Sequence, residues 1–159
     1  MPHITIEYMI MVPVLILQIF LFPLAAGWMM NIWVDSRRTL ALQEAASHLG
    51  STIQQIYFSL NHETIGTGTV TQKVDVPPFI ENHAYTGNAT LETLSQPENS
   101  SKVLEITLRM VDAKTSVTTS VILGSNIVWQ DSTFVSNSTN AGVRAIKFAN
   151  GTISLAFTG

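Results

Sequence analysis

An uncharged apolar run near the start of the chain constrains its fold most. No Asp, Glu, Lys or Arg occurs from Tyr8 to Val34, and this run is longer than the about 20 apolar residues that cross a bilayer as a helix. A cleaved secretory signal would combine a shorter apolar core with a preceding basic stretch. Trp28 and Trp33 lie near the far end of the run, where aromatic belts form at membrane interfaces. We therefore expect residues 1–38 to form a membrane-spanning or filament-core helix.

Residues 39–61 predict an amphipathic continuation of this helix. Apolar side chains recur there at three- and four-residue steps, as on one helix face: Leu42, Ala46, Leu49, Ile53, Ile56 and Leu60. Gly50 is a weak point of the pattern, because glycine costs about 1 kcal/mol relative to alanine inside a helix. We expect one nearly continuous helix from about Ile4 to Leu60, with its second part packed on the domain that follows.

Residues 62–159 predict a β-rich head domain. The apolar periodicity changes to two, which is typical of half-buried strands, and Asn150-Gly151 is a strong hairpin signal. Six regions carry these signals: Val70–Val76, the vicinity of Tyr85, Lys102–Val111, Thr115–Leu123, Ala145–Ala149 and Thr152–Phe157. Six or seven short strands joined by turns favour a β-sandwich. The expected fold class is α+β, a long N-terminal hydrophobic α-helix followed by an antiparallel β-sandwich head.

Composition disfavours several classes of function. Charged residues make up 12% of the chain, about half the usual share. The chain has no cysteine, which excludes a disulfide scaffold, a Cys-ligated zinc site and a thiol nucleophile. A net charge of −3 leaves no basic footprint for nucleic acid, and no nucleophile elbow or Gly-rich phosphate loop is present. We expect no enzyme activity, no cofactor and no metal, and an anchored enzyme or solute-binding module is the least favoured alternative.

Four Asn-x-Ser/Thr sequons bear on the compartment. All four lie in residues 62–159, and we expect each in a loop or turn: Asn88, Asn99, Asn137 and Asn150. Sequons accept glycans only outside the cell, although a Ser/Thr-rich segment also produces them by chance. Arg37-Arg38 after the apolar run point the other way, since the positive-inside rule would place the following domain in the cytoplasm. We give the sequons more weight and expect a single-pass protein with its C-terminal domain outside.

Glu7 stands at the head of the apolar run. A carboxylate there needs a partner, or it lies at the lipid headgroups or near the helix N-terminus, where negative charge is favoured. The motif Thr5-Ile6-Glu7, the apolar helix behind it and Pro23 within that helix together resemble the type IV pilin superfamily. The likeness is greatest to archaeal pilin-like proteins with a class III signal, which carry Glu at position five of the mature chain. It places the mature start at His3, with Met1-Pro2 where the family carries a basic residue and Gly.

The resemblance covers residues 3–60 and implies a structural filament subunit. Subunits of this family wait in the cell membrane, are processed by a prepilin peptidase, and are assembled by an ATPase and platform into a helical homo-oligomeric surface filament. By this likeness Glu7 pairs with the neighbour's N-terminal amine at His3, Thr5 belongs to the same motif, and Pro23 is the kinking proline. The alternative is a membrane-anchored accessory protein with an extracellular β-sandwich, similar to archaellum stator proteins or a minor pilin.

Overall fold

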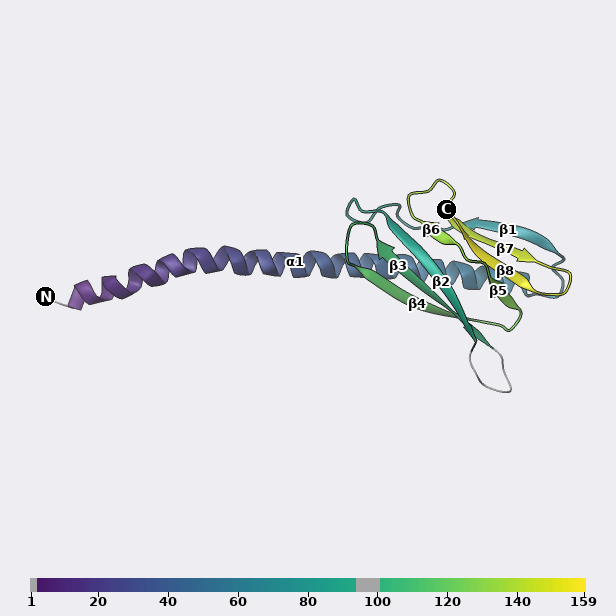
Figure 1. The fold of residues 1–159 in the computed structure, drawn as a ribbon, viewed down its shortest axis with the longest axis horizontal. Helices are drawn as coiled ribbons and strands as arrows, with labels where there is room; N and C mark the ends of the chain where they lie inside the picture. Colours follow the sequence, from purple (N-terminus) through teal and green to yellow (C-terminus); the bar gives the residue numbers. More distant parts are fainter. Residues whose placement is uncertain (1–2, 94–100) are drawn as a thin grey trace. The chain divides into compact units, whose positions relative to one another are not determined.

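A computed structural model of the chain describes residues 3–93 and 101–159, with the side chains described from residue 9 onward. One helix, α1 (His3–Leu60), comes first and eight strands follow within the described residues (Figure 1). The chain divides into two compact units, residues 1–37 and 38–159. The first is a purely helical unit, and the second contains the end of α1 together with every described strand.

The helical part of the first unit consists mainly of Leu, Ile, Met, Phe and Val. Pro13 and Pro23 both lie inside α1, and each removes one backbone hydrogen bond and favours a kink. Its large apolar side chains between Met9 and Trp33 are all about half exposed or more, from 49% at Val12 to 78% at Met9. The part of this unit whose side chains are described therefore has no hydrophobic core of its own.

The second part of α1 is amphipathic as predicted. All six positions expected on its buried face are 4% exposed or less, and Ala45 and Tyr57 widen the same stripe. Close packing explains why position 50 is a glycine, because a Cβ atom built there would lie 2.9 Å from Cγ2 of Val121. A glycine thus lets this part of the helix approach the sheet closely, which offsets its low helix propensity.

The strands form two four-stranded sheets, ordered β1-β7-β8-β5 and β4-β3-β2-β6. Their bounds are β1 Gly68–Lys73, β2 Tyr85–Thr93, β3 Lys102–Met110, β4 Ser116–Leu123, β5 Ile127–Trp129, β6 Thr133–Val135, β7 Gly142–Lys147 and β8 Ile153–Thr158. Every neighbouring pair is antiparallel except β5 and β8, which are parallel. The α+β class with a long apolar helix and a β-sandwich head is confirmed, with one parallel pair that the sequence did not predict.

One hydrophobic core joins the amphipathic part of α1 to both sheets. The two sheets meet where Phe134 of β6 lies 5.8 Å, centroid to centroid, from Phe157 of β8. Trp129 of β5 stacks edge-on against the same Phe157 at 4.8 Å. Phe134 and Phe157 belong to this core, and the partly buried Trp129 packs against it.

Two local expectations differ from the structure, and a third is confirmed. The segment starting at Val70 does not alternate between buried and exposed positions, because β1 is an edge strand exposed throughout. Strand β8 was expected to bury one face, but its residues from Ile153 to Phe157 are all buried, since both of its faces are covered. The hairpin predicted at Asn150-Gly151 is confirmed, because β7 and β8 pair antiparallel across a turn over Phe148–Thr152. Gly151 has φ 80° there, and its N–H donates to the Phe148 carbonyl at 3.0 Å.

Candidate functional site

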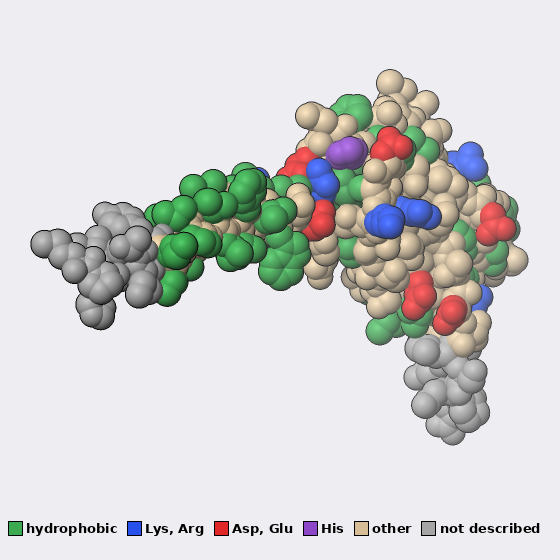
Figure 2. All heavy atoms as spheres, turned by 60° about the vertical axis from the view of Figure 1, so that its left-hand side comes forward, with side chains coloured by type: hydrophobic (Ala, Val, Ile, Leu, Met, Phe, Trp, Pro, Cys, Tyr) green, Lys and Arg blue, Asp and Glu red, His purple; other side chains and the backbone are tan. Residues whose placement is uncertain are grey.

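The exposed apolar surface of α1 is the main candidate functional surface. Hydrophobic side chains cover the helix from Met9 onward in the space-filling view (Figure 2), and none of the residues from 9 to 34 is charged. Soluble monomers rarely expose contiguous apolar patches of more than a few hundred Å². An exposed apolar surface of this extent is typical of segments that lipid or other apolar helices cover.

Helix α1 also satisfies the requirements for crossing a membrane. Within the part of the chain that the structure describes, it is the one helix long and apolar enough to do so, and its most apolar window is not buried inside the molecule. Core helices of soluble proteins can have similar composition, but they are mostly buried. The helix is thus consistent with a single-pass anchor.

The end of the apolar run carries a cation–aromatic contact. The guanidinium carbon of Arg37 lies 4.8 Å from the ring centroid of Trp33, a cation–π geometry. Such a pair suits a membrane interface, because the indole is amphipathic and the long Arg side chain can extend its charge toward water.

Arg38 connects the start of the second unit to a turn in the head. Its Nε donates to Oε2 of Glu81 at 2.7 Å, and both side chains are partly exposed. Glu81 and Asn82 have positive φ angles and form a tight turn in which Ile80 and His83 exchange backbone hydrogen bonds. A partly exposed ion pair of this kind contributes about 1 kcal/mol or less, so its role is to position the turn.

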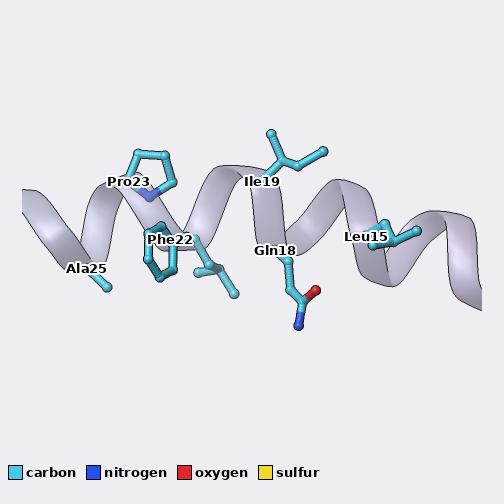
Figure 3. Close-up of a pocket in the computed structure, with 7 residues that line it drawn as sticks. Leu15, Gln18, Ile19, Phe22, Pro23 and Ala25 are labelled. Atoms are coloured by element: carbon cyan, nitrogen blue, oxygen red, sulfur yellow. The ribbon is translucent and has the colours of Figure 1, made fainter.

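Of the four predicted assembly residues, the structure describes only one in full. Pro23 lies in α1 and borders an open notch on the helix surface together with Gln18 and Phe22 (Figure 3). The backbones of His3, Thr5 and Glu7 are helical, but their side chains lie outside the described residues. The pairing of Glu7 with a neighbouring amine therefore stays a prediction.

The sequons differ in their local structure. Asn88 lies within β2, so its expected place in a loop was wrong, and its Oδ1 accepts a hydrogen bond from Thr133 Oγ1 at 3.1 Å. Asn137 and Asn150 are in turns, as expected, and all three side chains are exposed. Asn150 Oδ1 accepts the Thr152 N–H at 3.0 Å, which is an Asx turn. Asn99 lies outside the described residues.

A buried polar cluster in the head was not predicted. The hydroxyl of Tyr85 donates to the Pro77 carbonyl at 2.8 Å, and burial raises the pKa of Tyr85 to about 12. The Ser136 hydroxyl accepts the Tyr85 N–H at 2.9 Å and donates to the Pro78 carbonyl at 2.8 Å. These bonds fix the Pro77-Pro78 loop on the sheet, which gives the cluster a structural role.

The described residues contain no group of three or more His, Cys, Asp or Glu side chains able to hold a metal ion. No protein-family model, curated protein or solved structure matches the chain. The fold and the exposed helix thus define a broad class, an α+β protein whose head is joined to a helix able to cross a membrane.

Proposed function

We propose that the chain is a structural subunit of an extracellular type IV pilus-like filament. The observation that carries the proposal is the contrast within α1. Its second part buries one face in the head, whereas its apolar part is exposed from Met9 to Trp33. A subunit with this construction brings a complete head and leaves one long apolar surface for lipid before assembly and for other subunits after it.

Assembly transfers the apolar helix from lipid into a bundle of like helices. Its Leu, Ile and Phe side chains lose little in this step, because both surroundings are apolar. Glu7 supplies the register: an unpaired carboxylate in an apolar bundle costs several kcal/mol, and the N-terminal amine of a neighbour at His3 removes that cost. Pro13 and Pro23, both inside α1, weaken the backbone ladder locally and help the helices adapt to one another.

In this proposal the head lies outside the cell. The exposed side chains of Asn88, Asn137 and Asn150 are accessible to glycan transfer, which supports that orientation. The partners are further copies of the chain, the membrane, a prepilin peptidase, and an assembly ATPase with its platform.

The substitution Glu7→Ala tests the assembly role. We expect loss of surface fibres in electron micrographs while the chain stays in the membrane fraction, because the apolar helix is unchanged. Glu44→Ala is the matched control, since Glu44 is an exposed carboxylate on the head part of α1, and it should leave fibre number unchanged. Normal fibre number with Glu7→Ala would remove the pairing role.

A membrane-anchored accessory protein, similar to an archaellum stator or a minor pilin, is the second candidate. The contact between Arg37 and Trp33 favours it, because an interfacial anchor of this kind suits a helix that stays in lipid. Mass spectrometry of the N-terminal peptide separates the two candidates. A mature start at His3 supports the filament subunit, whereas a start elsewhere supports the permanent anchor.

A further inference from the structure

Gln18 is a strongly polar side chain deep within the apolar part of α1. It follows Tyr8 by ten residues and precedes Val34 by sixteen, which places it about 15 Å and about 24 Å along the helix from the ends of the run. In a membrane this depth is hydrocarbon, where no water is available to bind a carboxamide.

The carboxamide of Gln18 has no hydrogen-bond partner among the described residues. Its neighbours on the helix surface are mainly apolar, including Leu15, Ile19 and Phe22, and Figure 3 shows the side chain extending away from the ribbon. The group carries two N–H donors and one carbonyl acceptor. Leaving all of them unsatisfied in hydrocarbon is unfavourable, so a partner has to come from another molecule.

A second copy of this chain offers the matching chemistry. All copies of a single-pass protein insert in the same orientation, so two neighbouring helices are parallel and place Gln18 at the same depth. A carboxamide is self-complementary, because each one can donate an N–H to the carbonyl oxygen of the other.

The surroundings of Gln18 also suit a helix–helix contact. Ala25 follows by two turns and lies on the same side of the helix as Gln18 in the close-up, whereas Ile19 and Pro23 lie on the other side (Figure 3). A small residue at this place lets two helices approach closely. Apolar residues continue the Gln18–Ala25 face toward both ends of the helix, at the spacing of coiled-coil contact positions: Met11, Val14, Leu21 and Ile32.

We propose that Gln18 pairs two copies of this chain side by side in the membrane through a carboxamide–carboxamide hydrogen bond, with Ala25 at the contact. A single polar residue in such a seam also fixes the register of the two helices. The inference requires only that the helix resides in lipid, and it holds for either candidate function.

Disulfide trapping tests the pairing, because the chain contains no cysteine. Full-length Ala25→Cys and Ile19→Cys proteins are reconstituted separately in phosphatidylcholine vesicles without assembly proteins, and an oxidant is added. We expect a covalent dimer on non-reducing gels with Ala25→Cys and several-fold less with Ile19→Cys. Equal trapping at the two positions would show that the proposed face is wrong.

Removing the carboxamide tests the role of Gln18 itself. Interhelical hydrogen bonds strengthen helix association in membranes by about threefold to about thirtyfold, so Gln18→Leu should lower dimer formation of the Ala25→Cys protein by a factor in this range. Gln18→Asn, which keeps a carboxamide, should retain more of it.

Asn31→Leu is the matched control. It makes the same chemical change three residues before Val34, near the tryptophan-rich end of the run where water competes for the amide. Dimer formation of the Ala25→Cys protein should stay the same when Asn31→Leu is added. Undiminished dimer with Gln18→Leu, or an equal loss with Asn31→Leu, overturns the proposal. Because the vesicles hold no assembly proteins, a Glu7→Ala chain that forms no fibres in cells should still give this dimer.

Discussion

Replacing Leu42 by alanine should destabilise the head domain far more than replacing Leu40 by alanine. The two leucines are two residues apart on α1, but Leu42 is 0% exposed and Leu40 is 64% exposed. Truncating a buried leucine removes about 2.4 kcal/mol of transfer free energy at about 0.8 kcal/mol per carbon, and the remaining cavity adds to this cost. We therefore expect Leu42→Ala to lower the free energy of unfolding by about 3–4 kcal/mol.

Leu40→Ala is the matched control because it deletes the same atoms from the same helix turn. With about a third of the side chain covered, its cost should stay below about 1 kcal/mol. For a unit of this size, each kcal/mol shifts the melting temperature by about 3–5 °C. Leu42→Ala should thus lower the melting temperature of the head by about 9–20 °C, and Leu40→Ala by about 5 °C at most.

Fluorescence of Trp129 reports this transition. The chain has three tryptophans, and replacing Trp28 and Trp33 by phenylalanine leaves the one that packs against Phe157 in the head. Melting of the full-length protein in detergent micelles then follows the head alone. Similar small shifts for both leucine variants would refute the conclusion that α1 supplies part of the head's core.

Gly50, Tyr85 and two of the sequons each give a further prediction. Gly50→Ala should destabilise the head by about 1–2 kcal/mol in the same melting assay, because the new methyl group meets Cγ2 of Val121 at 2.9 Å and this overpacking outweighs the gain in helix propensity. Tyr85 has a pKa raised to about 12, so the stability it contributes is fully present below pH 10 and is lost as pH rises toward 12, by about 2–3 kcal/mol. Urea unfolding between pH 9 and 12 should show a smaller loss of unfolding free energy in Tyr85→Phe than in the unsubstituted protein. Equal losses in the two proteins would contradict the assignment of this pH dependence to Tyr85. Glycopeptide mass spectrometry should find higher occupancy at Asn150, in an exposed turn, than at Asn88, whose backbone is paired within a sheet, and the reverse order would show that acceptor choice precedes folding of the sheet.

The buried face of the second part of α1 could be predicted because its sequence signal is local. Residues such as Leu49 and Ile53 are buried at the three- and four-residue steps that any amphipathic helix must have. The close approach at Gly50 could not be predicted, because it depends on Val121 in a strand far along the chain. Sequence pattern thus located the packed face, and the partner that it packs against came only with the structure.

The short strands show where the local signal ends. Strands β5 and β6 have three residues each, which is too few to establish a period of two. The parallel pairing of β5 with β8 joins residues that no turn connects directly. Asn88 was placed in a loop because of its sequon, although its neighbours Gly87 and Ala89 are buried and follow the alternation of a strand.

The same reasoning explains why the candidate site was only partly accessible from sequence. The motif around Glu7 and the apolar run are visible in the residues, but the exposure of the run's side chains is not. The structure shows the large apolar side chains from Met9 to Trp33 about half exposed or more. In the sequence Gln18 is only a polar residue within the apolar run. Its lack of a hydrogen-bond partner among the described residues became visible only in the structure.

The two parts of α1 need different surroundings, and this difference determines which side chains can select between lipid and other copies of the chain. The amphipathic part buries one face and is satisfied by the head of the same molecule. The described side chains of the apolar part are exposed from Met9 to Trp33, so lipid and other apolar helices compete for it on nearly equal terms. Apolar side chains therefore cannot decide strongly between these two surroundings. Polar groups on the segment can, because hydrocarbon offers them no hydrogen bond, and in our proposal Gln18 favours contact between copies in the membrane while Glu7 fixes their register in the filament.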